Sequence, residues 1–299
     1  MSGKKEIFNK LKIIFSLIFT LFFFSLFEII SKRIDLDSVA LTGLRFFLGG
    51  LIIFILNLTA ILKELKLLDN LLKIKVILTG FLNVCIAMLS LQFAVKTGNA
   101  TTSAIIISSN PVFVYIINTI IENIDNRVKN NNFIAINLIR LTLLLFGVAG
   151  IFLIIYKKDV GDNLISISLA ILASISFATY TILTKKLLNK VSALTLNSLS
   201  FISNGLLLLF ISLLLFKSSI FVFFNFINIE KIIFLSILSF GTTGFAYITY
   251  FYALKNLDAV KVSLVFYLKP IIVLSLNYIF LFESIGINKL IGILIIIFS

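Results

Sequence analysis

Long apolar runs follow one another along almost the whole chain, and short polar stretches that carry most of the charged residues separate them. A helix needs about 20 apolar residues to cross the hydrocarbon core of a bilayer. The runs do not alternate between apolar and polar residues, as the strands of a membrane barrel would. We therefore predict transmembrane helices at Ile13–Ile30, Val39–Leu62, Ile74–Val95, Ala100–Ile121, Phe133–Tyr156, Leu164–Leu183, Ala193–Phe216, Ile232–Leu254, Ala259–Phe282 and Ile285–Ser299.

Two segments fit this pattern less well. Lys217–Glu230 is apolar but lies between two predicted helices, so we expect it to lie along the membrane surface. The run Ile285–Ser299 would reach only about 23 Å at the helical rise of 1.5 Å per residue. We expect there either a short helix or one that the end of the sequence cuts off.

The second half of the chain repeats the first. Ala94–Glu122 aligns with Ala253–Glu283 at a shift of 159 residues, and the only two prolines, Pro111 and Pro270, coincide. At the same shift Lys96 matches Lys255, Ala100 matches Ala259 and Asn118 matches Asn277. Earlier in each half the shift is 155 residues, and there Phe46 matches Phe201 and Gly50 matches Gly205.

Five helices in each half make the second half enter the membrane from the opposite side. The sequence therefore predicts an all-α integral membrane protein of ten helices, built as two inverted five-helix repeats, residues 1–157 and 158–299. Many secondary transporters share this architecture, because two similar halves in opposite orientation can exchange conformations.

Composition supports a membrane protein and excludes several functions. Hydrophobic residues make up 60% of the chain and charged residues only 13%, whereas about a quarter of a soluble domain is charged. The absence of His and the single Cys85 argue against metal sites and His-based catalysis, and we find no catalytic or nucleotide-binding motif. We expect no enzyme, no cofactor and no metal.

The net charge of +13 does not indicate nucleic acid, because the Lys and Arg residues are scattered over short loops. If the N-terminus is cytoplasmic, fifteen of them fall on the inner side and eight on the outer side. Cytoplasmic loops carry the excess of positive charge. We therefore predict that both termini are cytoplasmic in a cell membrane, inner or plasma.

Pro111 and Pro270 each remove a helical hydrogen bond, which would free the carbonyls of Ile107 and Phe266. A packing kink would explain each proline alone. Interrupted helices at corresponding positions of two repeats point instead to a binding site.

Lys269 lies near the middle of its predicted helix, where a charge costs about 2.5–3.5 kcal/mol on insertion scales. No acid is expected at the same depth, so we predict an unpaired amine that faces a cavity and favours a substrate carboxylate. A structural hydrogen bond to nearby carbonyls is the alternative. The equivalent residue in the first half is the neutral Asn110.

Glu28 and Arg45 lie one to two turns inside the first two helices. We predict that they form an ion pair, which would lower the cost of burying each. Glu28 could instead pair with Lys32, or act as a carboxylate that couples transport to protons.

Further polar residues within the predicted helices could either line a substrate site or join helices by hydrogen bonds. Those assigned to the site are Asn83, Tyr115, Tyr180, Tyr247 and Tyr267.

Three stretches resemble the drug/metabolite transporter superfamily, in its ten-helix EamA-type branch. They are LTGLRFFLGG from Leu41, QFAVKTGNATTSAIIISSNPVFV from Gln92 and YFYALKNLDAVKVSLVFYLKPIIV from Tyr250. The resemblance covers nearly the whole chain and makes each half an EamA-like repeat. It implies a secondary carrier, often an exporter of amino acids, other metabolites or drugs.

The prediction is thus an exporter of small organic metabolites, amino acids or organic acids first, that works by alternating access, with proton coupling left open. The partners expected are a small-molecule substrate and the lipid bilayer, and the chain would be a monomer or a homodimer. The alternatives are an exporter of cationic drugs, a membrane scaffold that transports nothing, and a lipid-handling protein.

Overall fold

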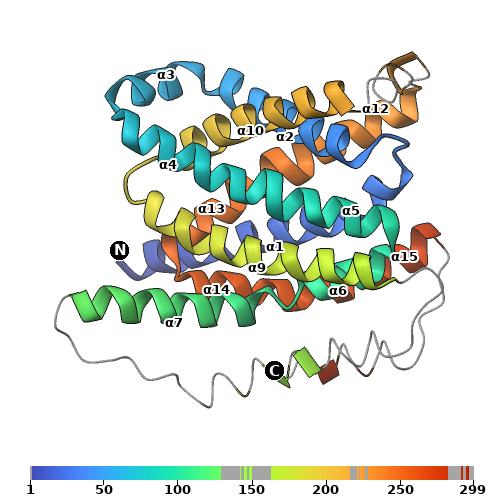
Figure 1. Ribbon diagram of the computed structural model, residues 1–299. Helices are drawn as coiled ribbons and strands as arrows, with labels where there is room; N and C mark the ends of the chain where they lie inside the picture. The colour runs from blue at the N-terminus through green and yellow to red at the C-terminus, as the bar shows by residue number, and fades with distance from the viewer. Residues whose placement is uncertain are drawn as a thin grey trace.

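The computed structural model describes residues 2–128, 163–215 and 228–281, together with 142, 145–146, 148–149, 221, 223–225, 291 and 294–295. Within these ranges the chain is helical and contains no strand. The helices, with π and 3₁₀ segments labelled η (Figure 1), are α1 Ser2–Arg33, α2 Ser38–Leu56, α3 Leu58–Leu67, α4 Asn70–Phe81, η1 Leu82–Met88, α5 Leu89–Thr97, α6 Ala100–Ile107, α7 Asn110–Val128, α9 Leu164–Leu187, α10 Ala193–Leu215, α12 Ile229–Ser236, η2 Ile237–Phe245, α13 Ala246–Asn256, α14 Ala259–Ser263, η3 Leu264–Leu268 and α15 Lys269–Leu281.

The described part of the chain has eight helical spans that are long and apolar enough to cross a membrane. They correspond to the first four predicted runs and to the sixth through ninth, so the chain is a multi-pass membrane protein. The fifth run, Phe133–Tyr156, and the tenth, Ile285–Ser299, lie almost entirely outside the described residues, as does much of Lys217–Glu230. The count of ten helices therefore stays a prediction.

The second predicted helix, Val39–Leu62, is longer than the helix in the structure. Helix α2 ends at Leu56, where the Asn57 side chain donates to the carbonyl of Ile53 at 3.1 Å. The chain changes direction at Asn57 and continues as the short helix α3. The Asn side chain competes for backbone hydrogen bonds and so favours a helix end. The prediction missed this end because the residues on both sides of Asn57 are apolar.

Helices α2 and α10 form the most extensive helix–helix contact of the described chain, and they lie side by side in Figure 1. A Cβ atom on Gly205 would lie 2.6 Å from the backbone nitrogen of Phe47, so only glycine allows this approach. The rings of Phe46 and Phe201, which the sequence alignment matches, meet edge to face at a centroid distance of 4.9 Å.

The 159-residue shift extends to features that the sequence analysis did not use. Asp69 caps α4 and Asn228 caps α12, each by accepting a hydrogen bond from the backbone N–H three residues on. The spans that follow these caps are Asn70–Thr97 and Ile229–Asn256, and each contains a π-helical segment, η1 or η2.

The two proline-containing spans are also interrupted at matching places. In the first, α6 ends at Ile107 and α7 begins at Asn110; in the second, η3 separates α14 from α15, which begins at Lys269. Each proline is thus the second residue of a new helix, where its missing N–H costs little. The predicted free carbonyl at Phe266 is wrong, because the tighter 3₁₀ turn lets it accept from the backbone N–H of Lys269.

Candidate substrate site

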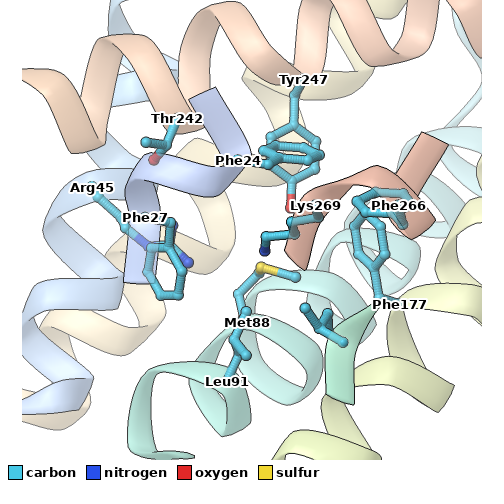
Figure 2. Close-up of a pocket in the computed structure, with 11 residues that line it drawn as sticks. Phe24, Phe27, Arg45, Met88, Leu91, Phe177, Thr242, Tyr247, Phe266 and Lys269 are labelled. Carbon is cyan, nitrogen blue, oxygen red and sulfur yellow. The ribbon is translucent and has the colours of Figure 1, made fainter. Parts of the chain in front are cut away.

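A small cavity lies at the centre of the helix bundle (Figure 2). Its volume is about 30 Å³, which is room for roughly two water molecules. Its walls are mostly apolar, and two cations interrupt them. The lining residues are Phe24, Phe27, Arg45, Met88, Leu91, Ile107, Phe177, Thr242, Tyr247, Phe266 and Lys269.

All four interrupted spans reach this cavity. Met88 is the last residue of η1, Thr242 lies in η2, and Phe266 lies in η3. Ile107 is the last residue of α6, directly before the break that precedes Asn110. Helical irregularities of this kind are frequent at functional sites, and here they converge on one place.

Lys269 reaches into the cavity from the first residue of α15, and in Figure 2 its amine points toward Met88. The residue is 3% exposed and forms a salt bridge with Oε1 of Glu28, which is fully buried in α1. The predicted unpaired amine is therefore wrong. The error came from placing Glu28 at a helix end, whereas α1 packs lengthwise against α15 and brings the carboxylate to the lysine.

Arg45 lies on α2 at the cavity wall and is 2% exposed. Its guanidinium lies over the rings of Phe27 and Phe46, at 4.3 and 4.7 Å from their centroids. Among the described residues its Nε and Nη2 have no hydrogen-bond partner. Glu28 forms its salt bridge with Lys269 and not with Arg45, although the charges of Glu28 and Arg45 still attract each other at longer range. The alternative partner, Lys32, donates to the carbonyl of Gly98.

Tyr247 connects the two π-helical spans. It follows η2 directly, and its hydroxyl donates to Oδ1 of Asn83 in η1 at 3.2 Å. Its ring contacts Phe24 at 5.1 Å and Phe201 at 4.9 Å between centroids. The structure thus places both predicted residues at the cavity wall or directly behind it.

Asn110 occupies the position that matches Lys269 but does not line the cavity. It is fully buried, and its Nδ2 donates to the carbonyl of Ser174 in α9 at 3.1 Å. The neighbouring Ser109 hydroxyl lies 3.3 Å from that of Ser174. This break therefore joins α7 to α9 by hydrogen bonds.

The remaining predicted residues lie elsewhere. Tyr180 is buried behind the cavity, with its ring 5.8 Å from that of Phe177. Tyr115 and Tyr267 belong to a separate apolar cluster with Ile105 and Val112, away from the cavity lining.

The apolar lining of the cavity could not be predicted from the sequence. Phe24, Phe177 and Phe266 come from three different helices, and their rings lie within 6.3 Å of one another. Among 32 Phe residues no signal singles these three out. Where the structure describes the chain, no cluster of His, Cys, Asp and Glu could hold a metal ion.

The sequence is similar to a transporter family and to two transporters. The model of the EamA-like transporter family matches residues 11–156 and again residues 164–299. An uncharacterized transporter of Clostridium kluyveri is 30% identical over 94% of this chain and 89% of its own length. An uncharacterized transporter in the trpA 3′ region of Buchnera aphidicola subsp. Schlechtendalia chinensis is 27% identical over 87% of this chain and 83% of its own.

A solved crystal structure shares the fold. It superposes with a TM-score of 0.68 over 97% of this chain and 94% of the other, at 13% identity. At that identity the likeness concerns the arrangement of helices.

Proposed function

The chain belongs to the EamA-like transporter family, and we propose that it is a secondary transporter that exports small organic metabolites across a cell membrane by alternating access. Both termini would be cytoplasmic, as the distribution of Lys and Arg favours. The motivating observation is the convergence of η1, the α6–α7 break, η2 and η3 on one cavity. Irregular backbone within a membrane is tolerated where it is buried in protein or lines a cavity.

The same proposal includes two inverted five-helix repeats, residues 1–157 and 158–299. Matching caps, matching π segments and matching breaks at one shift of 159 residues support it, and the family model matches the chain twice. In such transporters the binding site lies between the repeats, where interrupted helices meet.

The cavity has room for only about two waters, so it must widen to admit a solute. Transport then requires that the breaks flex and open the cavity to one side and next to the other. The energy would come from the gradient of the solute or of protons. For protons the acceptor would be Glu28, because its Oε2 has no partner among the described residues.

Alternating access can be tested before a substrate is known. Cys85 is the only cysteine, so a Cys85→Ala background allows a single new cysteine at Thr242, in the cavity wall. A membrane-impermeant thiol reagent is applied to right-side-out and to inside-out membrane vesicles. It should modify Thr242→Cys slowly in both preparations. The control Leu67→Cys, at an exposed position, should react in only one of them. Modification of Thr242→Cys from a single side would contradict alternating access and favour a scaffold or a receptor.

Flux measurements then test transport itself. Purified protein in proteoliposomes should release a preloaded mixture of metabolites faster than liposomes without protein, and mass spectrometry of the medium would identify the solutes that move. The same release from protein-free liposomes would contradict the proposal.

A further inference from the structure

We propose that Arg45 binds the carboxylate of the transported solute, and that this solute is a small organic monoanion with an apolar body. The inference rests on the proposed transport function and names the substrate class of the same cavity. It moves the anion-binding role from Lys269, which the sequence analysis favoured, to a residue that the sequence analysis assigned to an ion pair.

The geometry of the guanidinium carries the first part of the inference. Phe27 and Phe46 contact the group by cation–π interactions, which use none of its N–H groups as hydrogen-bond donors. Its Nε and Nη2 have no partner in the described part of the chain. These two N–H groups lie on the same edge of the guanidinium and form the parallel fork that binds a carboxylate through two hydrogen bonds.

The charge balance of the cavity carries the second part. Lys269 and Glu28 form a salt bridge, and together they sum to zero wherever the shared proton resides. With Arg45 added, the group holds two cations and one acid, which leaves one net positive charge at this cavity. A buried net charge is costly. A monoanion removes this charge, whereas a zwitterion leaves it in place and a cation doubles it.

The rest of the lining indicates the body of the solute. Phe24, Phe177 and Phe266 supply apolar surface, and Thr242 has its hydroxyl committed to the carbonyl of Leu238 at 2.7 Å. Arg45 thus brings an unpaired fork to the cavity wall, covered from water in this conformation, and the lining offers little for further polar groups on the solute. Because its present volume is small, the fitting solutes are small.

Three solutes with the same branched carbon skeleton test the inference. At neutral pH 4-methylpentanoate is a monoanion, leucine a zwitterion and 3-methylbutylamine a cation. Isothermal titration of the full chain in lipid nanodiscs should show that 4-methylpentanoate binds at least about tenfold more tightly than either of the others. Tighter binding of leucine or of the amine would overturn the inference, as would an absence of binding by 4-methylpentanoate.

Variants separate the role of Arg45 from that of the ion pair. Arg45→Gln should lose at least about tenfold in affinity for 4-methylpentanoate. Arg45→Lys keeps the charge but lacks the fork, so it should lose affinity while still ranking the monoanion first. In Glu28→Gln/Lys269→Met the net charge of the cavity is unchanged, and the order of the three solutes should persist even if every affinity changes.

Unchanged affinity in Arg45→Gln would overturn the inference, as would a reversed order in the double variant. If Arg45→Gln fails to fold, as size-exclusion chromatography would show, Arg45→Lys and the wild-type ranking still decide the question. The labelling of Thr242→Cys needs no ligand, so alternating access can stand when the substrate class fails.

Discussion

The two helix breaks that precede Pro111 and Pro270 have matching positions and different chemistry. At the first break Asn110 is neutral and donates to the backbone of α9. At the second break Lys269 is charged, lines the cavity and pairs with Glu28 from α1. The comparison teaches that a duplicated backbone interruption can serve as a helix–helix contact in one half and as part of the candidate site in the other.

The asymmetry depends on which neighbour each break meets. Helix α1 packs against α15 and brings a carboxylate to the second break, whereas α9 brings the neutral carbonyl and hydroxyl of Ser174 to the first. A neutral amide is sufficient at the first position. A lysine is tolerable at the second because its charge is matched by a buried acid.

Removing the lysine should give the largest effect. Lys269→Met leaves the Glu28 carboxylate buried without its partner, so we expect a loss of about 3–5 kcal/mol in stability and loss of flux. Thermal unfolding in detergent would measure the first as a lowered Tm, and proteoliposomes the second.

The double variant Glu28→Gln/Lys269→Met is the matched control for that loss. It removes both charges, and replacing a buried pair is often close to neutral, so most of the lost Tm should return. A double variant as unstable as Lys269→Met alone would mean that the pair does not account for the effect.

The neutral break should be less sensitive. Asn110→Ala removes the hydrogen bond to Ser174, whose carbonyl keeps its bond within α9, so we expect a cost of about 0.5–1.5 kcal/mol. Flux should persist in the folded fraction, because Asn110 does not line the cavity. Asn118→Ala is the control on the same helix; its partner Glu122 is exposed, and the change should stay within about 0.5 kcal/mol. Loss of flux without loss of stability in Asn110→Ala would break the comparison.

The closely packed contact between α2 and α10 can be compared with the irregular helical segments by adding one methyl group to each. In Gly205→Ala the new methyl group would meet the Phe47 backbone at 2.6 Å, and we expect a loss of about 1–3 kcal/mol from overpacking. In Gly244→Ala, in η2, the nearest atom would be 3.5 Å away, so Tm should hardly change. Equal Tm values for the two variants would show that helices α2 and α10 can move apart to accommodate the added methyl group, which would contradict the expected overpacking.

Glu64 provides a half-buried carboxylate to compare with the fully buried Glu28. It lies in α3 and accepts from the backbone and side chain of Ser192, at 2.7 and 2.5 Å, and from Thr195 at 2.5 Å. Partial burial acts to raise the pKa of Glu64, but these hydrogen bonds outweigh it and lower the pKa below its usual value.

A lowered pKa in the folded state means that the charged form contributes stability above the unfolded pKa, and that this contribution is lost as pH falls through the folded one. Glu64→Gln should therefore cost about 1 kcal/mol at neutral pH, since solvent screens much of the effect. The Tm difference from wild type should shrink in acid, below about pH 4. A difference that grows as pH falls would contradict this account.

The sequence predicted the helical spans well because membrane helices must be apolar over about 20 residues. It also located the two breaks, because proline excludes a helical interior. It could not predict the Glu28–Lys269 pair, because that contact depends on which helices are neighbours and how they are staggered. Residues 241 positions apart share no local pattern.

The π segments and the Asn57 turn escaped prediction for a different reason. A π-helical segment changes the hydrogen-bond register by one residue without needing a particular residue type, so apolar sequence conceals it. Tyr115 and Tyr267 were assigned to the site as polar residues within predicted helices. The rotation of each helix about its axis decides which side faces the cavity, and both residues pack in another cluster.

The contact between α2 and α10 also bears on how such a chain could arise. Phe46 meets Phe201, its own counterpart in the alignment, and the two helices approach through glycines on both sides. Two copies of one protein form an interface of this self-complementary kind about a twofold axis. Under the proposed inverted repeat, an ancestor of one half that inserted in both orientations could form a dimer through this face, and fusion of two gene copies would let the halves diverge until one carried Asn110 and the other Lys269.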